Sequence, residues 1–283
     1  MNEHMTLYSW VREGAAIHLA QVLRSESLPA APGQEAVTIQ MQIQQTLWGV
    51  PGDPVRVAQI VQPSSETARL KFPDPLWGRV DLRRRPAILL VTKEPDRLTD
   101  PLYVEEIRSA QDPVLAALNE VLVVERMKLA GSQRIPRYLR WLQEGQSVQA
   151  LFGAEALAKD EDLKEVDKTG QVAQAFAQVF SANSDVYVRL SVGAWMWEEI
   201  FTKTNAHGEV AILNATIRGL DGSDEDIRRF SFDRLLAVDA AKLRQPGVAR
   251  NAAAANVLRR AAQDSPVPSD RAQIKHLLEA IAE

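Results

Sequence analysis

The sequence predicts a multidomain protein with both α and β structure: a five-stranded β-barrel domain over residues 1–108 and an α-helical repeat domain over residues 109–283. Two observations predict this division. Near residue 110 the hydrophobic period changes from every second residue to every third or fourth. Beyond that point, helical segments recur at a nearly constant interval. A length of 283 residues also agrees with two domains of about 150 residues each.

The first domain is predicted from alternating hydrophobic and polar residues. From residue 37 to residue 44, Val, Ile and Met occupy the odd positions and Thr and Gln the even ones, which is typical of a strand with one buried face. The expected strands cover residues 16–23, 36–47, 55–61, 80–82 and 87–91, and the expected loops cover residues 25–34 and 63–75. Short strands with hairpin-like connections favour a closed or partly open barrel, because closure removes unpaired edges.

The second domain is predicted from helical periodicity. Its first helix begins at Asp112 and Pro113, an N-cap acceptor followed by a proline at the first helical position. The expected helices cover residues 113–130, 136–144, 147–159, 170–181, 185–201, 208–219, 224–238, 246–263 and 270–282. Ser184 and Ser223 are the expected N-caps of two of them.

These helices are expected to form repeats. The candidate second helices of successive pairs start near Val148, Val188, Ile227 and Arg271, at intervals of 40, 39 and 44 residues. A pair of about 40 residues buries its apolar face only by stacking on neighbouring pairs, which predicts a curved array. The alternative is an irregular helical bundle.

Two parts of the chain resemble known families. Residues 37–43, 47–49, 55–57 and 86–91 carry the first resemblance. Through these segments, residues 15–93 resemble the netrin-like barrel of tissue inhibitors of metalloproteinases, an OB-type fold also found in bacterial extracytoplasmic proteins. Residues from 112 onward resemble HEAT-like helical repeats.

The barrel resemblance implies an extracytoplasmic location, periplasmic or secreted, although the first residues show no signal peptide. Inhibitors of that family chelate zinc through an amino-terminal cysteine. This chain contains no cysteine, so an inhibitor-like protein built on it would act by another route.

Composition and motifs exclude several functions. The formal net charge is -4, without the basic excess that phosphate binding needs, so a nucleic-acid partner is disfavoured. No apolar run approaches the roughly 18 residues of a membrane span. The four histidines stand at no metal-ligand spacing, and no nucleophile elbow, phosphate loop or dinucleotide fingerprint occurs. We therefore expect no enzyme activity, no metal and no cofactor.

Two groups of residues are candidate binding sites. The run Arg83, Arg84 and Arg85 at a barrel rim offers guanidinium groups to an acidic partner, a phosphate or a carboxylate, although a solvated loop is the alternative. Trp195 and Trp197 lie about 200° apart on a helix. One of them is therefore expected to be an exposed interface anchor, unless both pack between helices.

The sequence thus favours a non-catalytic protein-binding or adaptor protein that uses the helical surface and the barrel rim. One alternative is an OB-type module that binds a carbohydrate or another ligand. The second alternative is a protease-inhibitor-like protein without the cysteine-dependent mechanism.

Overall fold

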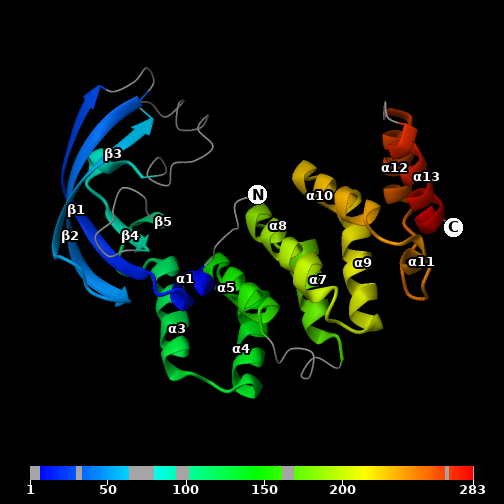
Figure 1. The fold of residues 1–283 in the computed structure, drawn as a ribbon, viewed down its shortest axis with the longest axis horizontal. Helices are drawn as coiled ribbons and strands as arrows, with labels where there is room; N and C mark the ends of the chain where they lie inside the picture. The colour runs from blue at the N-terminus through cyan, green and yellow to red at the C-terminus, as the bar shows by residue number, and fades with distance from the viewer. Residues whose placement is uncertain are drawn as a thin grey trace. The chain divides into compact units, whose positions relative to one another are not determined.

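The computed structural model describes residues 7–29, 34–63, 80–93, 102–160, 169–264 and 268–282. The chain divides into two compact units, Met1–Lys128 and Leu129–Glu283, each of which is described by itself. Figure 1 shows their helices and strands. The predicted boundary at residue 108 lies between the last strand of the first unit and its helix α3 (Pro113–Met127).

The first unit contains one antiparallel sheet. Its strands are β1 (Ala16–Pro29), β2 (Gln34–Trp48), β3 (Val55–Pro63), β4 (Ala87–Thr92) and β5 (Tyr103–Ile107). They lie side by side in the order β3-β2-β1-β4-β5, and each neighbouring pair is antiparallel. The strands expected at residues 16–23, 36–47, 55–61 and 87–91 are therefore confirmed, although β1 continues through part of the expected loop 25–34.

The sheet is open, so the expected closure into a barrel is wrong. Strands β3 and β5 are its two edges and do not pair with each other within the described residues. The register supplies the reason. Strand β3 pairs with Gln34–Gln42 of β2, which opposes the second half of β1, whereas β4 pairs with Ala16–Gln21 in the first half. The short outer strands therefore lie at opposite ends of the two long central strands.

The strand expected at residues 80–82 is also wrong. Leu82–Arg84 form a 3-10 turn, η2. Its N-cap is Asp81, whose side chain accepts a hydrogen bond from the backbone N–H of Arg83. The fifth strand is instead Tyr103–Ile107, which the hydrophobic pattern does not reveal because two glutamates interrupt it. The loop expected at residues 63–75 lies, beyond Pro63, outside the described residues.

The core of the first unit follows the period of two in its strands. The buried side chains that pack on one face of the sheet are Ala20, Val22, Val37, Ile39, Met41, Ala58, Val80, Leu82, Ile88, Leu90 and Val104. In β4 the intervening Leu89 and Val91 are buried as well, which explains the unbroken apolar run of that strand. A helix at the start of the chain, α1 (Leu7–Arg12), was not expected from the sequence.

The second unit is helical throughout its described residues. Its helices are α4 (Gly131–Glu144), α5 (Ser147–Ala158), α7 (Gln171–Ala182), α8 (Val186–Trp195), α9 (Ala206–Leu220), α10 (Glu225–Leu236), α11 (Ala240–Leu243), α12 (Ala252–Asp264) and α13 (Pro268–Ala282), with a π-helical turn, η3 (Met196–Ile200), after α8. The prediction of one helix over residues 246–263 is wrong in its first part. The side chain of Asn251 accepts hydrogen bonds from the backbone N–H groups of Ala253 and Ala254, so α12 starts after Asn251, at Ala252.

Consecutive helices of this unit pack as pairs. Within the described residues the pairs are α4 with α5, α7 with α8, α9 with α10, and α12 with α13. First helices contact the next first helix, and second helices the next second helix. The second helices start at Ser147, Val186, Glu225 and Pro268, at intervals of 39, 39 and 43 residues. None of the described helices combines the length and the apolarity that a bilayer span requires.

Candidate functional site

The arginine run lies on the surface of the first unit. Arg83, Arg84 and Arg85 are all exposed. Asp81 binds two of them, since Oδ1 accepts from the Arg83 backbone N–H at 3.3 Å and Oδ2 lies 3.2 Å from Nε of Arg84. Arg85 adopts a left-handed conformation with φ of 54°, and its carbonyl accepts from Gln21 at 2.6 Å. The run is thus held by backbone contacts and by the Arg84–Asp81 ion pair, and its side chains are exposed.

The two tryptophans differ in environment. Trp197 is only 9% exposed, its Nε1 donates to Thr216 at 3.1 Å, and its ring centroid lies 4.5 Å from that of Phe201. Trp195, at the end of α8, is half-buried. The π-helical turn begins directly after it. Trp197 is thus a packed core residue with a satisfied indole N–H, and Trp195 retains some exposed surface.

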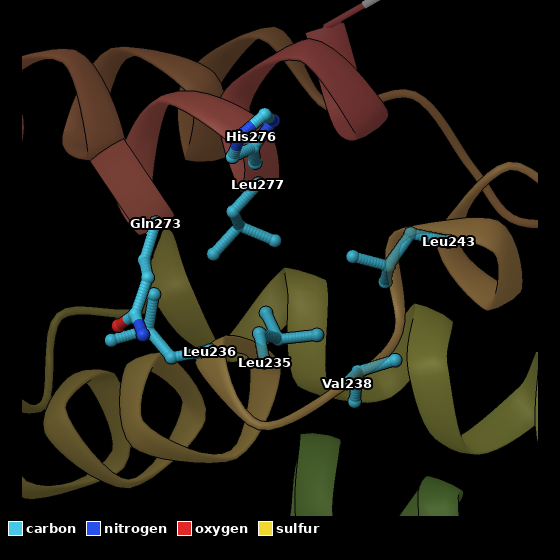
Figure 2. Close-up of a pocket in the computed structure, with 7 residues that line it drawn as sticks. All are labelled: Leu235, Leu236, Val238, Leu243, Gln273, His276 and Leu277. Carbon is cyan, nitrogen blue, oxygen red and sulfur yellow. The ribbon is translucent and has the colours of Figure 1, made fainter. Parts of the chain in front are cut away.

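A pocket of about 230 Å³ lies between three elements of the second unit (Figure 2). Its lining residues come from the end of α10, from the turn after it, from α11 and from α13: Leu235, Leu236, Val238, Leu243, Gln273, His276 and Leu277. Figure 2 shows Leu243 and Leu277 pointing toward the same central space. The sequence does not reveal this pocket, because residues 235–243 and 273–277 are distant along the chain and α11 was not expected.

The walls of the pocket are apolar and its polar groups are few. Leu235, Leu243 and Leu277 are almost fully buried. Gln273 and His276 are exposed, and Nδ1 of His276 lies 3.7 Å from a carboxylate oxygen of Glu279. The volume is below the roughly 300–1,000 Å³ of typical small-molecule sites. A space of this size and lining suits one apolar side chain of a bound polypeptide. The polar side chains of Gln273 and His276 are then available to the backbone of that polypeptide.

The described residues contain no candidate metal centre. Within them, no group of three or more histidine, aspartate or glutamate side chains gathers at a spacing that could hold a metal ion. The arginine run belongs to the first unit, whereas the tryptophans and the pocket belong to the second.

No protein-family model, curated protein or solved structure matches this chain. The resemblances to netrin-like barrels and HEAT-like repeats therefore rest on sequence patterns alone. An extracytoplasmic location likewise stays a prediction.

Proposed function

We propose that this chain is a non-catalytic binding protein whose partner is another protein. The second unit is an α-solenoid of HEAT-like type, and its pocket takes an apolar side chain of the partner. Such an array offers long surfaces for binding without requiring catalytic groups.

Recurring contacts support the solenoid. In α8 and α10, the fourth residue is an arginine that donates to a carbonyl near the end of the preceding helix. Arg189 Nε donates to Phe180 O at 2.7 Å, and Arg228 Nη1 donates to Gly222 O at 2.8 Å. The N-caps of the same two helices, Asp185 and Asp224, are 39 residues apart and both accept from backbone N–H groups. The same combination of an aspartate N-cap and an arginine–carbonyl hydrogen bond therefore recurs in two successive helix pairs.

The pocket is the observation that carries the proposal. It is apolar, open to solvent and sized for a single side chain, as interface anchors require. Gln273 can both donate and accept hydrogen bonds, which suits the peptide groups beside such an anchor. An OB-type ligand module has weaker support, because the sheet is not closed into the barrel on which that module depends.

Affinity capture with the full chain, followed by direct binding measurements with the recovered partner, tests the proposal. Leu236 is a half-buried pocket residue, so Leu236→Lys places a charge at the pocket while leaving the deeper leucines in place. The matched control is Leu151→Lys, which changes a half-buried leucine on α5.

We expect wild type and L151K to bind the partner alike, and L236K to bind at least about tenfold more weakly, since a desolvated charge opposes an apolar anchor. Thermal unfolding of each variant checks that the fold persists. Robust turnover in an activity screen without a recovered partner would overturn the proposal, and so would a partner that binds L236K as tightly as wild type.

A further inference from the structure

We infer that the solvent-facing side of α4, α7, α9 and α12 binds an extended acidic segment of a partner protein. We call this side the first-helix face. The inference rests on the proposed function and adds the chemical class of the partner segment. It concerns a surface separate from the pocket, which is formed by α10, α11 and α13.

The first-helix face carries amides and arginines. Along each helix, most of its exposed or half-buried members lie three, four or seven residues apart, as one solvent-facing stripe does. The amide side chains are Gln133, Gln143, Gln171, Gln174, Gln178, Asn214, Asn256 and Gln263. The exposed arginines are Arg140, Arg218, Arg259 and Arg260.

Contacts between neighbouring helices join these stripes. Gln143 of α4 donates to Gln178 of α7 at 3.2 Å. Arg218 of α9 donates to Ser181 of α7 at 3.3 Å. Asn214 of α9 binds the segment that leads into α12, donating to Gly247 O at 3.0 Å. The polar stripes therefore form one continuous surface across successive pairs.

The charge on this face is the opposite of the charge on the chain. The net charge of the protein is -4, yet among the described exposed side chains of these four helices the one carboxylate is Glu144, at the end of α4. The half-buried Glu209 of α9 is paired with Lys242 at 2.8 Å. The exposed carboxylates Glu198, Glu225, Asp226 and Asp233 lie instead on η3 and α10, where Arg234 pairs with Glu198 at 2.8 Å and Arg229 is also exposed. An acidic segment is therefore attracted to the first-helix face, where exposed arginines outnumber the described exposed carboxylate, more than to α10, whose charges are of both signs.

The amides favour a polypeptide over a nucleic acid. Glutamine and asparagine side chains donate and accept, as the N–H and C=O groups of an extended peptide do. Nucleic-acid binders use a basic excess and aromatic platforms for the bases. Between the arginines of α4 and α9, helix α7 contributes no charge to this face, only glutamines and small residues.

The helix spacing sets the length of the segment. Packed helices are about 8–10 Å apart and an extended chain rises about 3.3 Å per residue, so about nine residues reach from α4 to α12. Acidic residues are expected at both ends of the segment, near Arg140 and near Arg259. Uncharged polar residues are expected in the middle, opposite the glutamines of α7.

The test is fluorescence anisotropy of the full chain with a labelled peptide of about 12 residues, glutamates at both ends and serines between. A peptide with lysine in place of glutamate and a single-stranded DNA of similar length are the comparison probes. We expect the acidic peptide to bind, and its affinity to fall as salt rises from about 50 to 200 mM. The double variant R259E/R260E should bind it at least about tenfold more weakly.

Arg229→Glu is the matched control, because it reverses an exposed arginine on α10 and should leave peptide binding unchanged. If R259E/R260E fails to fold, Arg218→Glu on α9 serves instead. Equal loss in R229E, a lysine peptide that binds as well as the acidic one, or tighter binding of DNA each overturns the inference. A partner that is lost in L236K but retained in R259E/R260E leaves the proposed function standing and removes this inference alone.

Discussion

Arg134 of α4 donates twice to one carboxylate oxygen of Asp160, from Nε at 3.0 Å and from Nη2 at 2.8 Å. Asp160 lies just beyond α5, so this ion pair ties the two helices of one pair together. The partners differ in burial, since the side chain of Asp160 is 2% exposed and that of Arg134 is 27% exposed. Losing either partner therefore has unequal consequences.

Arg134→Met should destabilise the second unit more than Asp160→Asn. The first change leaves a buried carboxylate without its guanidinium, which costs about 3 kcal/mol. The second leaves a guanidinium that reaches water, at a cost of about 1 kcal/mol. Urea unfolding of both variants measures the two free energies of unfolding, and the reverse order would contradict this account.

Thr216→Val should destabilise the second unit by about 1–3 kcal/mol, because it leaves the buried indole N–H of Trp197 without its acceptor. Thr202→Val on the surface is the control and should change stability by less than about 0.5 kcal/mol. A double-mutant cycle with Trp197→Phe should show coupling of about 1 kcal/mol. Additive effects in that cycle would mean that the hydrogen bond contributes nothing to stability.

Helix positions were largely predictable from sequence, but only some of their caps were: Asp112 is the N-cap of α3, as expected. Ser184 and Ser223 are the expected N-caps, yet the side chains that accept from the first turns belong to the next residues, Asp185 and Asp224. Serine and aspartate are both good caps, so composition cannot choose between neighbours. The choice depends on which residue the tertiary path places at the end of the helix.

The sheet shows a second limit. Alternation predicted β1, β2 and β3, an unbroken apolar run predicted β4, and neither pattern marks β5, where Glu105 and Glu106 interrupt it. Closure of the barrel depends on which halves of β1 and β2 the neighbouring strands pair with. Pairing between strands that are far apart in the sequence leaves no local pattern from which the register could be predicted. The pocket is unpredictable for the same reason, since Leu243 and Leu277 meet only through tertiary packing.

Asp224→Ala should destabilise the second unit by about 1 kcal/mol, whereas Ser223→Ala should change its stability by less than about 0.5 kcal/mol. The carboxylate of Asp224 accepts from the backbone N–H of Ile227 at 3.0 Å, and Ser223 is exposed. Chemical denaturation of the two single variants compares them directly. A larger loss of stability in S223A than in D224A would show that Ser223, the residue expected from the sequence, is the N-cap.

Helices α9 and α10 approach closely where Gly219 faces Ser231. A Cβ atom on Gly219 would lie 2.1 Å from Oγ of Ser231 and 3.2 Å from its Cβ. Within the described part of the chain, the buried hydroxyl of Ser231 has no hydrogen-bond partner. Glycine therefore permits a helix contact that any larger residue would disturb.

Gly219→Ala should destabilise the second unit by about 1–2 kcal/mol, because the overlap with Ser231 outweighs the better helix propensity of alanine. Ser231→Ala removes the unpartnered hydroxyl and should be neutral or stabilising by up to about 1 kcal/mol. In the S231A background, G219A should cost at least about 1 kcal/mol less than in the wild type, since the closest overlap is gone. Urea unfolding of the four proteins completes the cycle. An equal cost of G219A in both backgrounds would show that this contact does not limit the approach of the two helices.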